Sequence, residues 1–307
     1  MATTAQPGDS ARPIALVSAR VARDLDEDLP PLVAAMVARD LAVEVVDWDD
    51  GGVDWSRFQA ALLRSTWDYA TRLPEFLAWL PRVARATRLH NAEQVVRWNV
   101  DKHYLAGLER AGVAIVPSEF IEPEEAAEGA LQGFLNRHAA RELVVKPAVG
   151  AGSRDAQRYG REELAAILPH VRRLLAAQRS VLLQPYLERV DEQGETALIY
   201  FGGEFSHAIR KGPLLRRGAA PTRALFAPEQ ITARRPDPDE LTLAMRALQA
   251  LPFSTPLYAR IDLIRAADGS PGVLELELTE PSLFFVQEPG AAARFVAAVV
   301  AELAGAN

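Results

Sequence analysis

The chain has 307 residues, of which 49% are apolar and 24% are charged, a composition typical of a globular protein with two or three lobes. It contains no cysteine, which excludes disulfides, thiolate metal sites and cysteine nucleophiles. A net charge of −7 argues against general nucleic-acid binding, because proteins of that class carry basic surfaces that neutralise phosphates.

The N-terminus shows no targeting or membrane signal. No apolar run in the chain approaches the roughly 18 residues of a membrane span. Residues 1–12 are small and polar and lack the apolar core of a signal peptide. We therefore expect a cytoplasmic protein with no membrane and no nucleic-acid partner, and a disordered N-terminus over residues 1–12.

Short strands alternate with helices over residues 13–99, which we assign to an N-terminal α/β domain. We expect strands at 14–17, 43–47 and 60–64, and helices at 30–39, 74–85 and 92–99. Such alternation predicts an open parallel sheet, in which ligands bind beyond the carboxyl ends of the strands. No glycine-rich turn follows Val17 or Val46, so this domain lacks a dinucleotide-binding fingerprint.

A polar cluster directly follows the third of these strands. The run RSTWDY places Arg64, Ser65 and Asp68 at the expected ligand-binding edge, and we take them as candidate substrate-binding residues. The alternative is a capped turn with a packed Trp67, and the two interpretations have about equal weight.

Residues 100–183 form a second, smaller lobe in this interpretation. We expect helices at 101–111, which carries Lys102, and at 123–138, followed by a strand at 142–148. Lys146 interrupts the apolar run of that strand, and because lysine is rarely buried without a partner, we expect an anion beside it.

A loop of small residues follows Lys146. Its residues are Gly150, Ala151, Gly152 and Ser153. Such a loop is able to present backbone N–H groups to phosphate oxygens. It is neither a Walker loop nor a GxGxxG turn, so a flexible strand connection is the alternative.

The second lobe ends with a helix that we expect at 161–178, bent or broken near Pro169, and with a strand at 181–187, interrupted at Gln184 and Pro185. We assign residues 184–307 to a C-terminal lobe. Residues 196–201 and 204–211 predict a hairpin with a two-glycine turn. The two lobes therefore meet near residues 184–188.

A basic stretch follows the hairpin. Residues 210–235 carry seven Arg or Lys residues and one acid, with no clear period. So long an irregular stretch predicts a lid or a disordered segment, and its cations indicate attraction to phosphate or carboxylate groups. A solvated loop is the alternative.

An acidic hairpin lies between two closing helices, which we expect at 237–251 and 290–303. Residues 257–264 and 272–282 alternate as two antiparallel strands, which places Asp262, Glu275 and Glu277 on one face. Opposed like charges only about 5 Å apart repel each other. Carboxylates at this density suit Mg²⁺, which one or two carboxylates usually hold together with substrate phosphates. A solvated strand face is the alternative.

Together these motifs resemble the ATP-grasp superfamily over most of the chain. The resemblance depends on Asp101-Lys102, on VVKP at 144–147 with the small-residue loop, on QPYLE at 184–188, and on Asp262 with Glu275-x-Glu277. It implies an α/β fold in which two lobes clasp ATP beside the N-terminal open parallel α/β lobe. Glu277 is a departure, because relatives such as glutathione synthetase often carry Asn there.

The resemblance also implies roles for individual residues. Lys102 and Lys146 would contact the ATP phosphates, and Gly150, Ala151, Gly152 and Ser153 would cover them. Gln184, Tyr186 and Leu187 would line the adenine site, with Glu195 near the ribose. Asp262, Glu275 and Glu277 would bind one or two Mg²⁺ ions. The γ-phosphate would pass to a carboxylate, giving an acylphosphate that an amine attacks, and Arg210, Arg260 and Lys211 are the candidates to stabilise it.

Longer runs resemble a narrower group, the cyclo-ligases of cycloserine biosynthesis, which close O-ureido-serine into a ring. These runs are RSTWDY, RWNVDKHYL, KPAVGAGSRD, GETALIYFGGEFSHAIRKGP and ELELTEPSLF. This likeness implies a small amino-acid-like substrate held by Arg64, Ser65, Asp68 and the basic stretch. An intermolecular carboxylate–amine ligase and a non-catalytic ATP-binding module are the alternatives. A homodimer is expected by analogy only.

Overall fold

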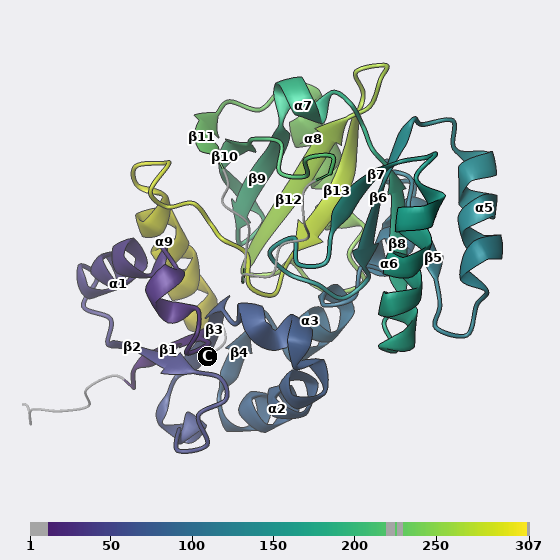
Figure 1. Ribbon diagram of the computed structural model, residues 1–307. Coiled ribbons are helices and arrows are strands. Elements are labelled where there is room, and N and C mark those ends of the chain that lie inside the picture. Colours follow the sequence, from purple (N-terminus) through teal and green to yellow (C-terminus); the bar gives the residue numbers. More distant parts are fainter. Residues whose placement is uncertain (1–11, 219–224, 226–229, 306–307) are drawn as a thin grey trace, which may run out of the picture.

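The computed structural model describes residues 12–218, 225 and 230–305, and within them the strands form three sheets (Figure 1). The predicted disordered N-terminus lies, apart from Arg12, outside the described residues. None of the described helices has the length and apolar character needed to cross a membrane.

The first sheet has the strand order β2-β1-β3-β4 and is parallel throughout. Its strands are β1 (Ile14–Ser18), β2 (Val43–Asp47), β3 (Ala60–Ser65) and β4 (Arg88–His90), and its helices are α1 (Leu29–Val37), α2 (Leu73–Ala86) and α3 (Glu93–Asn99). Strands β1 and β3 are buried along their whole length. The parallel α/β alternation predicted for this region is confirmed, and β4 is an additional strand too short to show a period.

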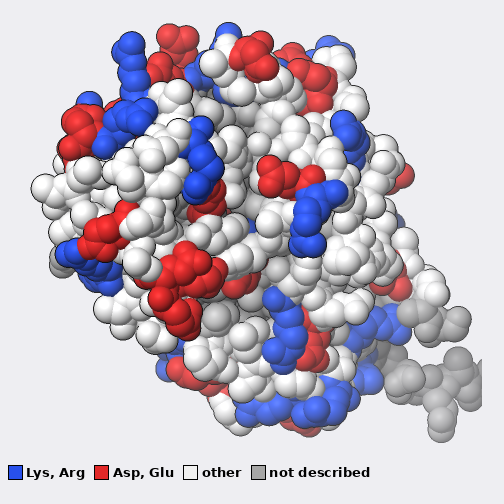
Figure 2. Space-filling model, turned by 90° about the vertical axis from the view of Figure 1, so that its right-hand side faces the viewer, with Lys and Arg blue, Asp and Glu red and all other residues white. Residues whose placement is uncertain are grey.

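The second sheet is antiparallel and has the order β5-β8-β6-β7. Its strands are β5 (Glu119–Ile121), β8 (Val181–Pro185), β6 (Glu142–Pro147) and β7 (Gln157–Gly160), and α4 (Tyr104–Arg110), α5 (Ala127–Arg137) and α6 (Leu164–Ala176) belong to the same part of the chain. Of the bend or break predicted near Pro169, the break is wrong, because α6 continues through that residue. Helices α5 and α6 lie on the side of the molecule shown in Figure 2, where acidic and basic side chains are interspersed.

The third sheet is antiparallel, with the order β11-β10-β9-β12-β13. Its strands are β9 (Glu195–Phe201), β10 (Glu204–Lys211), β11 (Ile231–Arg234), β12 (Tyr258–Arg265) and β13 (Pro271–Glu277), and α7 (Val190–Gln193), α8 (Pro238–Gln249) and α9 (Ala291–Ala304) complete this part. The predicted hairpin turn at Gly202 and Gly203 is confirmed, and at Gly203, where φ is 84°, a Cβ would lie 2.9 Å from Thr255 Cγ2.

The basic stretch is not irregular throughout. Lys211 ends β10, and β11 adds a strand at residues 231–234 that pairs with β10. Residues 219–224 and 226–229 of the predicted lid lie outside the described residues. The prediction missed β11 because a four-residue strand is too short to show a recognisable period.

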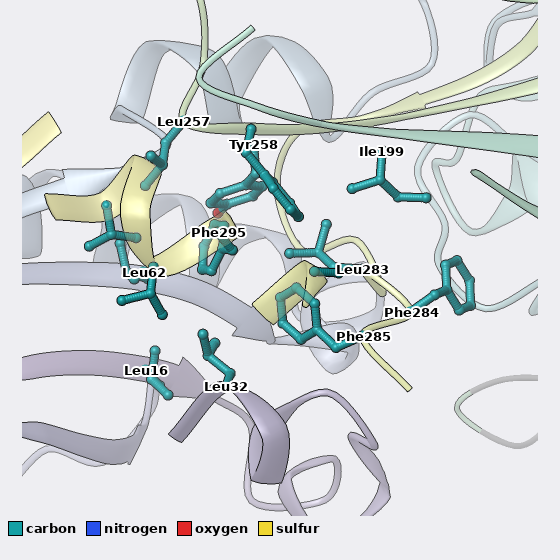
Figure 3. Packing of buried hydrophobic residues seen from close by; sticks show 14 of the residues in the cluster. Leu16, Leu32, Leu62, Ile199, Leu257, Tyr258, Leu283, Phe284, Phe285 and Phe295 are labelled. Atoms are coloured by element: carbon teal, nitrogen blue, oxygen red, sulfur yellow. The ribbon is translucent and has the colours of Figure 1, made fainter. Parts of the chain in front are cut away.

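A shared hydrophobic core joins the first sheet to the third (Figure 3). Leu16, Leu32 and Leu62 of the N-terminal domain pack in one cluster with Tyr258 of β12 and Phe295 of α9. The Tyr258 hydroxyl lies 3.1 Å from the Leu63 carbonyl oxygen and 3.0 Å from that of Thr279. The chain after β13 is therefore fixed against the carboxyl end of β3.

Candidate active site

A cavity of about 460 Å³ is lined by residues from the second and third sheets and from segments of the N-terminal domain outside its strands. Strands β6 and β8 contribute Lys146 and Gln184, and β13 contributes Glu275 and Glu277. The N-terminal domain contributes residues near Asp26 and Trp67, and the chain after β10 contributes Leu214 and Leu215. Side chains that are distant in sequence thus meet in one cavity.

The two predicted phosphate-binding lysines lie on opposite sides of Glu275. Lys102 Nζ lies 2.9 Å from Glu275 Oε1 and also donates to the Gly150 carbonyl oxygen at 2.9 Å. Lys146 Nζ lies 4.0 Å from Glu275 Oε2. Burial lowers the pKa of Lys146, whereas for Lys102 burial is outweighed by Glu275, which raises its pKa. The anion expected beside Lys146 is therefore present in the protein, as the carboxylate of Glu275.

The small-residue loop lines the cavity next to these lysines. Gly150, Ala151, Gly152 and Ser153 all contribute to the lining. Gly152 and Ser153 have positive φ angles of 61° and 60°. Arg179 holds the loop from behind, since it donates to Asp155 at 2.8 Å and to the Val149 carbonyl oxygen at 3.1 Å. The loop is therefore a fixed part of the cavity wall.

The predicted adenine-binding residues line another part of the cavity. These are Gln184, Tyr186 and Leu187. The guanidinium carbon of Arg158 lies 3.5 Å from the centre of the Tyr186 ring, and the Tyr186 hydroxyl donates to Asp191 at 2.6 Å. Tyr186 is thus held between β7 and α7. Glu195 also lines the cavity and lies 3.1 Å from Lys211 Nζ.

The acidic hairpin forms as predicted, with Asp262 paired to Glu275 and Arg260 paired to Glu277 across β12 and β13. Each carboxylate has a cation. Arg260 lies 2.9 Å from Asp262 and also bonds Glu277, and Lys211 lies 2.7 Å from Asp262. Against the effect of burial, Arg260 and Lys211 hold the pKa of Asp262 below its usual range.

Two acids of the cavity lining, Glu277 and Glu280, have pKa values shifted in the opposite direction. Burial raises the pKa of Glu277, and the neighbouring Glu275 and Asp262 add to that rise. Burial, and next to it Glu277, raise the pKa of Glu280 to about 8. Within the described residues, no three Asp, Glu, His or Cys side chains are grouped closely enough to hold a metal ion by themselves. Glu275 and Glu277 line the cavity, and Asp262 does not.

Besides Asp262, four predicted site residues lie outside the cavity lining. Arg210 donates to the carbonyl oxygens of Gln193 and Glu192, at 2.5 Å and 2.9 Å, at the end of α7. Arg64 donates to the Pro281 carbonyl oxygen at 3.1 Å, and Ser65 bonds the Ser18 hydroxyl at 2.8 Å. Asp68 accepts from the Trp48 indole at 2.8 Å. Their contacts are structural, and their neighbours Trp67 and Tyr69 line the cavity instead.

Sequence reasoning did not select several lining residues. Asp26, Glu280, Trp67 and Tyr69 are the main ones. Glu280 belongs to the run ELELTEPS, but strand alternation places it on the leucine side, and β13 has already ended at Glu277. Asp26 stands in an irregular turn before α1, where no period exists to indicate a direction.

The fold identifies the class. PsnB, an ATP-grasp ligase, superposes with a TM-score of 0.63 at 20% identity, covering 94% of this chain and 99% of that chain. D-alanine–D-alanine ligase from Bacillus anthracis complexed with ATP gives a TM-score of 0.66 at 15% identity, covering 96% and 98%. At such identities the likeness shows the fold alone, and the fold is that of the ATP-grasp ligases.

The sequence comparisons identify the family. Residues 14–91 match the model described as "D-cycloserine synthetase DcsG, N-terminal domain". The cycloserine biosynthesis protein DcsG of Streptomyces lavendulae is 44% identical over 298 residues, which is 94% of this chain and 98% of that protein. The crystal structure of D-cycloserine synthetase DcsG, also 44% identical, superposes with a TM-score of 0.90 over 94% of this chain and 99% of that chain. The chain belongs to the DcsG family and is an ATP-grasp ligase.

Proposed function

We propose that this enzyme uses ATP and Mg²⁺ to phosphorylate the carboxylate of a small amino acid, whose own nitrogen then closes a ring. The observation that carries the proposal is the convergence of Lys102, Lys146, Glu275 and Glu277 on one cavity. Phosphoryl transfer depends mainly on positioning and on charge stabilisation, and this convergence supplies both.

The nucleotide would occupy the part of the cavity between the second and third sheets. Lys102 and Lys146 would exchange Glu275 for phosphate oxygens, and the loop at residues 150–153 would cover them. Gln184, Tyr186 and Leu187 would contact adenine, and Glu195 the ribose. The cavity is lined by these residues and by Leu215, which supports the assignment.

Glu275 and Glu277 fit a magnesium site, because Mg²⁺ is usually held by one or two carboxylates together with substrate phosphates. When bound, the ion would neutralise charge on the transferred phosphate. Asp262 would act indirectly, because its ion pairs with Arg260 and Lys211 fix those two side chains at the cavity wall. Arg260 and Lys211 would steady the acylphosphate. Arg210 is not part of this proposal, because its guanidinium caps α7.

The substrate in this proposal is O-ureido-serine, as the sequence resemblance implies, and the 44% identity to a protein of cycloserine biosynthesis supports it. A carboxylate oxygen attacks the γ-phosphorus, and the bond to ADP breaks. The oxygen-linked nitrogen of the same molecule then attacks the acyl carbon, phosphate leaves, and the N–H proton leaves with it. Hydrolysis of the carbamoyl group by water completes the product.

The test is to incubate the purified enzyme with ATP, Mg²⁺ and O-ureido-serine, without any amine. ADP release together with a cyclised product, detected by mass spectrometry, is the expected result. ADP release that requires a second, separate amine would replace this proposal with an intermolecular ligase. Nucleotide binding without ADP release under all these conditions would indicate a non-catalytic ATP-binding module.

A further inference from the structure

The carboxylates that line the cavity differ in whether a cation accompanies them. The pairs are Glu275 with Lys102, Glu277 with Arg260, Glu195 with Lys211, and Asp28 with Arg64. Glu280 and Asp26 line the same cavity. In the part of the chain that the structure describes, neither forms a salt bridge within 4.0 Å. Glu27 also lines the cavity without a salt bridge, but its side chain is exposed. Glu280 and Asp26 are therefore the buried carboxylates of the described lining that have no salt bridge.

Both unpaired carboxylates are buried, with only 7% of Glu280 and 5% of Asp26 exposed. Glu280 hydrogen-bonds the neutral hydroxyl of Tyr69. Asp26 accepts from the Asp28 backbone N–H through Oδ1 at 3.0 Å, and among the described residues its buried Oδ2 has no hydrogen-bond partner. Burying an ionised carboxylate costs several kcal/mol unless a cation compensates it. This end of the cavity therefore suits a cationic ligand group.

The two carboxylates approach this end from different domains. Asp28 accepts from the backbone N–H groups of Leu283, Phe284 and Phe285, at 2.5 Å, 3.1 Å and 2.7 Å. These bonds fix the turn that carries Asp26 against the segment that follows Glu280. Arg260 donates to the Ser282 carbonyl oxygen of the same segment at 3.2 Å. A ligand at Glu280 thus lies close to the proposed acylphosphate site.

We propose that Glu280 and Asp26 recognise the α-ammonium group of the substrate, with Glu280 as the contact residue. This inference rests on the proposed function and specifies the substrate class: zwitterionic amino acids in preference to simple carboxylic acids. In an α-amino acid the ammonium nitrogen is two bonds from the carboxyl carbon. An ammonium at Glu280 therefore directs the reacting carboxylate toward Arg260 and the nucleotide phosphates.

The experiment compares two probes by calorimetry in the presence of Mg²⁺ and a non-hydrolysable ATP analogue. One probe is O-ureido-serine, and the other is the same molecule with hydrogen in place of the ammonium group. A charge-assisted hydrogen bond predicts that the wild type prefers the amino probe by about 10- to 100-fold. Glu280→Gln should abolish most of this preference, and Asp26→Asn should reduce it by about 3- to 10-fold, because Asp26 acts at longer range.

The controls separate recognition from structure. Glu109→Gln makes the same change at an exposed residue of α4 and should preserve the preference. Tyr69→Phe keeps the Glu280 carboxylate and should also preserve it. Equal binding of the two probes by the wild type, or an equal loss of both in Glu280→Gln, would overturn the inference. If Glu280→Gln fails to fold, Asp26→Asn tests the inference instead, and an equal loss of binding of both probes in that variant would overturn it. A wild type that prefers the amino probe but releases no ADP would contradict the proposed function and leave this inference in place.

Discussion

Removing one or the other buried lysine should have opposite effects on the stability of the free protein. Lys146 is a buried cation whose nearest carboxylate oxygen, on Glu275, is 4.0 Å away, and burial disfavours its charge. Lys102 makes closer contacts, at 2.9 Å to both Glu275 and the Gly150 carbonyl oxygen. Lys146→Met therefore removes an unfavourable buried charge, whereas Lys102→Met leaves two acceptors without their donor.

The size of the expected change in stability depends on which partner groups each substitution leaves unpaired. Breaking a buried ion pair costs about 3 to 5 kcal/mol, and we expect the lower end for Lys102→Met because the Glu275 side chain is 23% exposed. At about 2 to 4 °C per kcal/mol, the melting temperature should fall by about 6 °C or more. Lys146→Met should melt at the wild-type temperature or above it. Each variant loses a charged hydrogen bond to ATP worth about 1.5 to 3 kcal/mol, so the Kd should rise about 10- to 150-fold.

The assay combines thermal melting of the free proteins with calorimetric titration of ATP and Mg²⁺. The matched pair controls for side-chain size, since both changes replace lysine by methionine in the same cavity. A Lys146→Met protein that melts as early as Lys102→Met, yet binds ATP like the wild type, would refute the reasoning. Lys146 would then be a structural residue.

Three further changes test contacts around the cavity and the pH dependence of stability. Arg158→Met removes the cation stacked on Tyr186 and should raise the KM for ATP about 3- to 10-fold with little change in kcat, measured by ADP release; an unchanged KM would contradict this role. Asp28→Asn replaces an acceptor of three backbone N–H groups and should lower the free energy of unfolding by about 2 to 4 kcal/mol in urea titrations. Burial lowers the pKa of His170 to about 4, so the unfolded chain binds the proton first and stability falls as the pH drops from about 6.5 toward 4; His170→Gln should flatten this part of the profile, and an unaltered profile would argue against it.

Strand alternation is what made much of the fold and part of the site predictable. It assigns each side chain of a strand to one face, and it put Glu275 and Glu277 on the face that lines the cavity. Lys146, which also lines the cavity, was grouped with them by the resemblance to the ATP-grasp superfamily. The turn at Gly202 and Gly203 was predictable for a local reason, since a two-residue hairpin turn needs positive φ angles. In contrast, strands of three or four residues, such as β4 and β11, are too short to show any period.

The sequence was least informative where the chain leaves regular structure. Arg64 was expected at a ligand-binding sheet edge, but it is buried, and the carbonyl oxygen of Pro281, 217 residues further on, accepts its hydrogen bond. Asp68 is likewise occupied by the indole of Trp48. Contacts between residues so distant in sequence follow from tertiary packing, which no local pattern encodes. The same limitation hid Asp26 and Glu280.

The ion pairs of the cavity account for how so many buried charges coexist before any ligand binds. Glu275 neutralises Lys102, and Arg260 neutralises Glu277, so most of the charges that would contact ATP and magnesium already have partners. When ATP phosphates pair with Lys102 and Lys146, Glu275 loses its cations. An unpaired buried carboxylate costs free energy, and only another cation offsets that cost. We therefore infer that ATP and magnesium bind with positive coupling, because together they exchange each internal partner for an external one. Glu280 and Asp26 stand outside this exchange, because neither forms a salt bridge among the described residues, and a cationic substrate group would supply the missing partner.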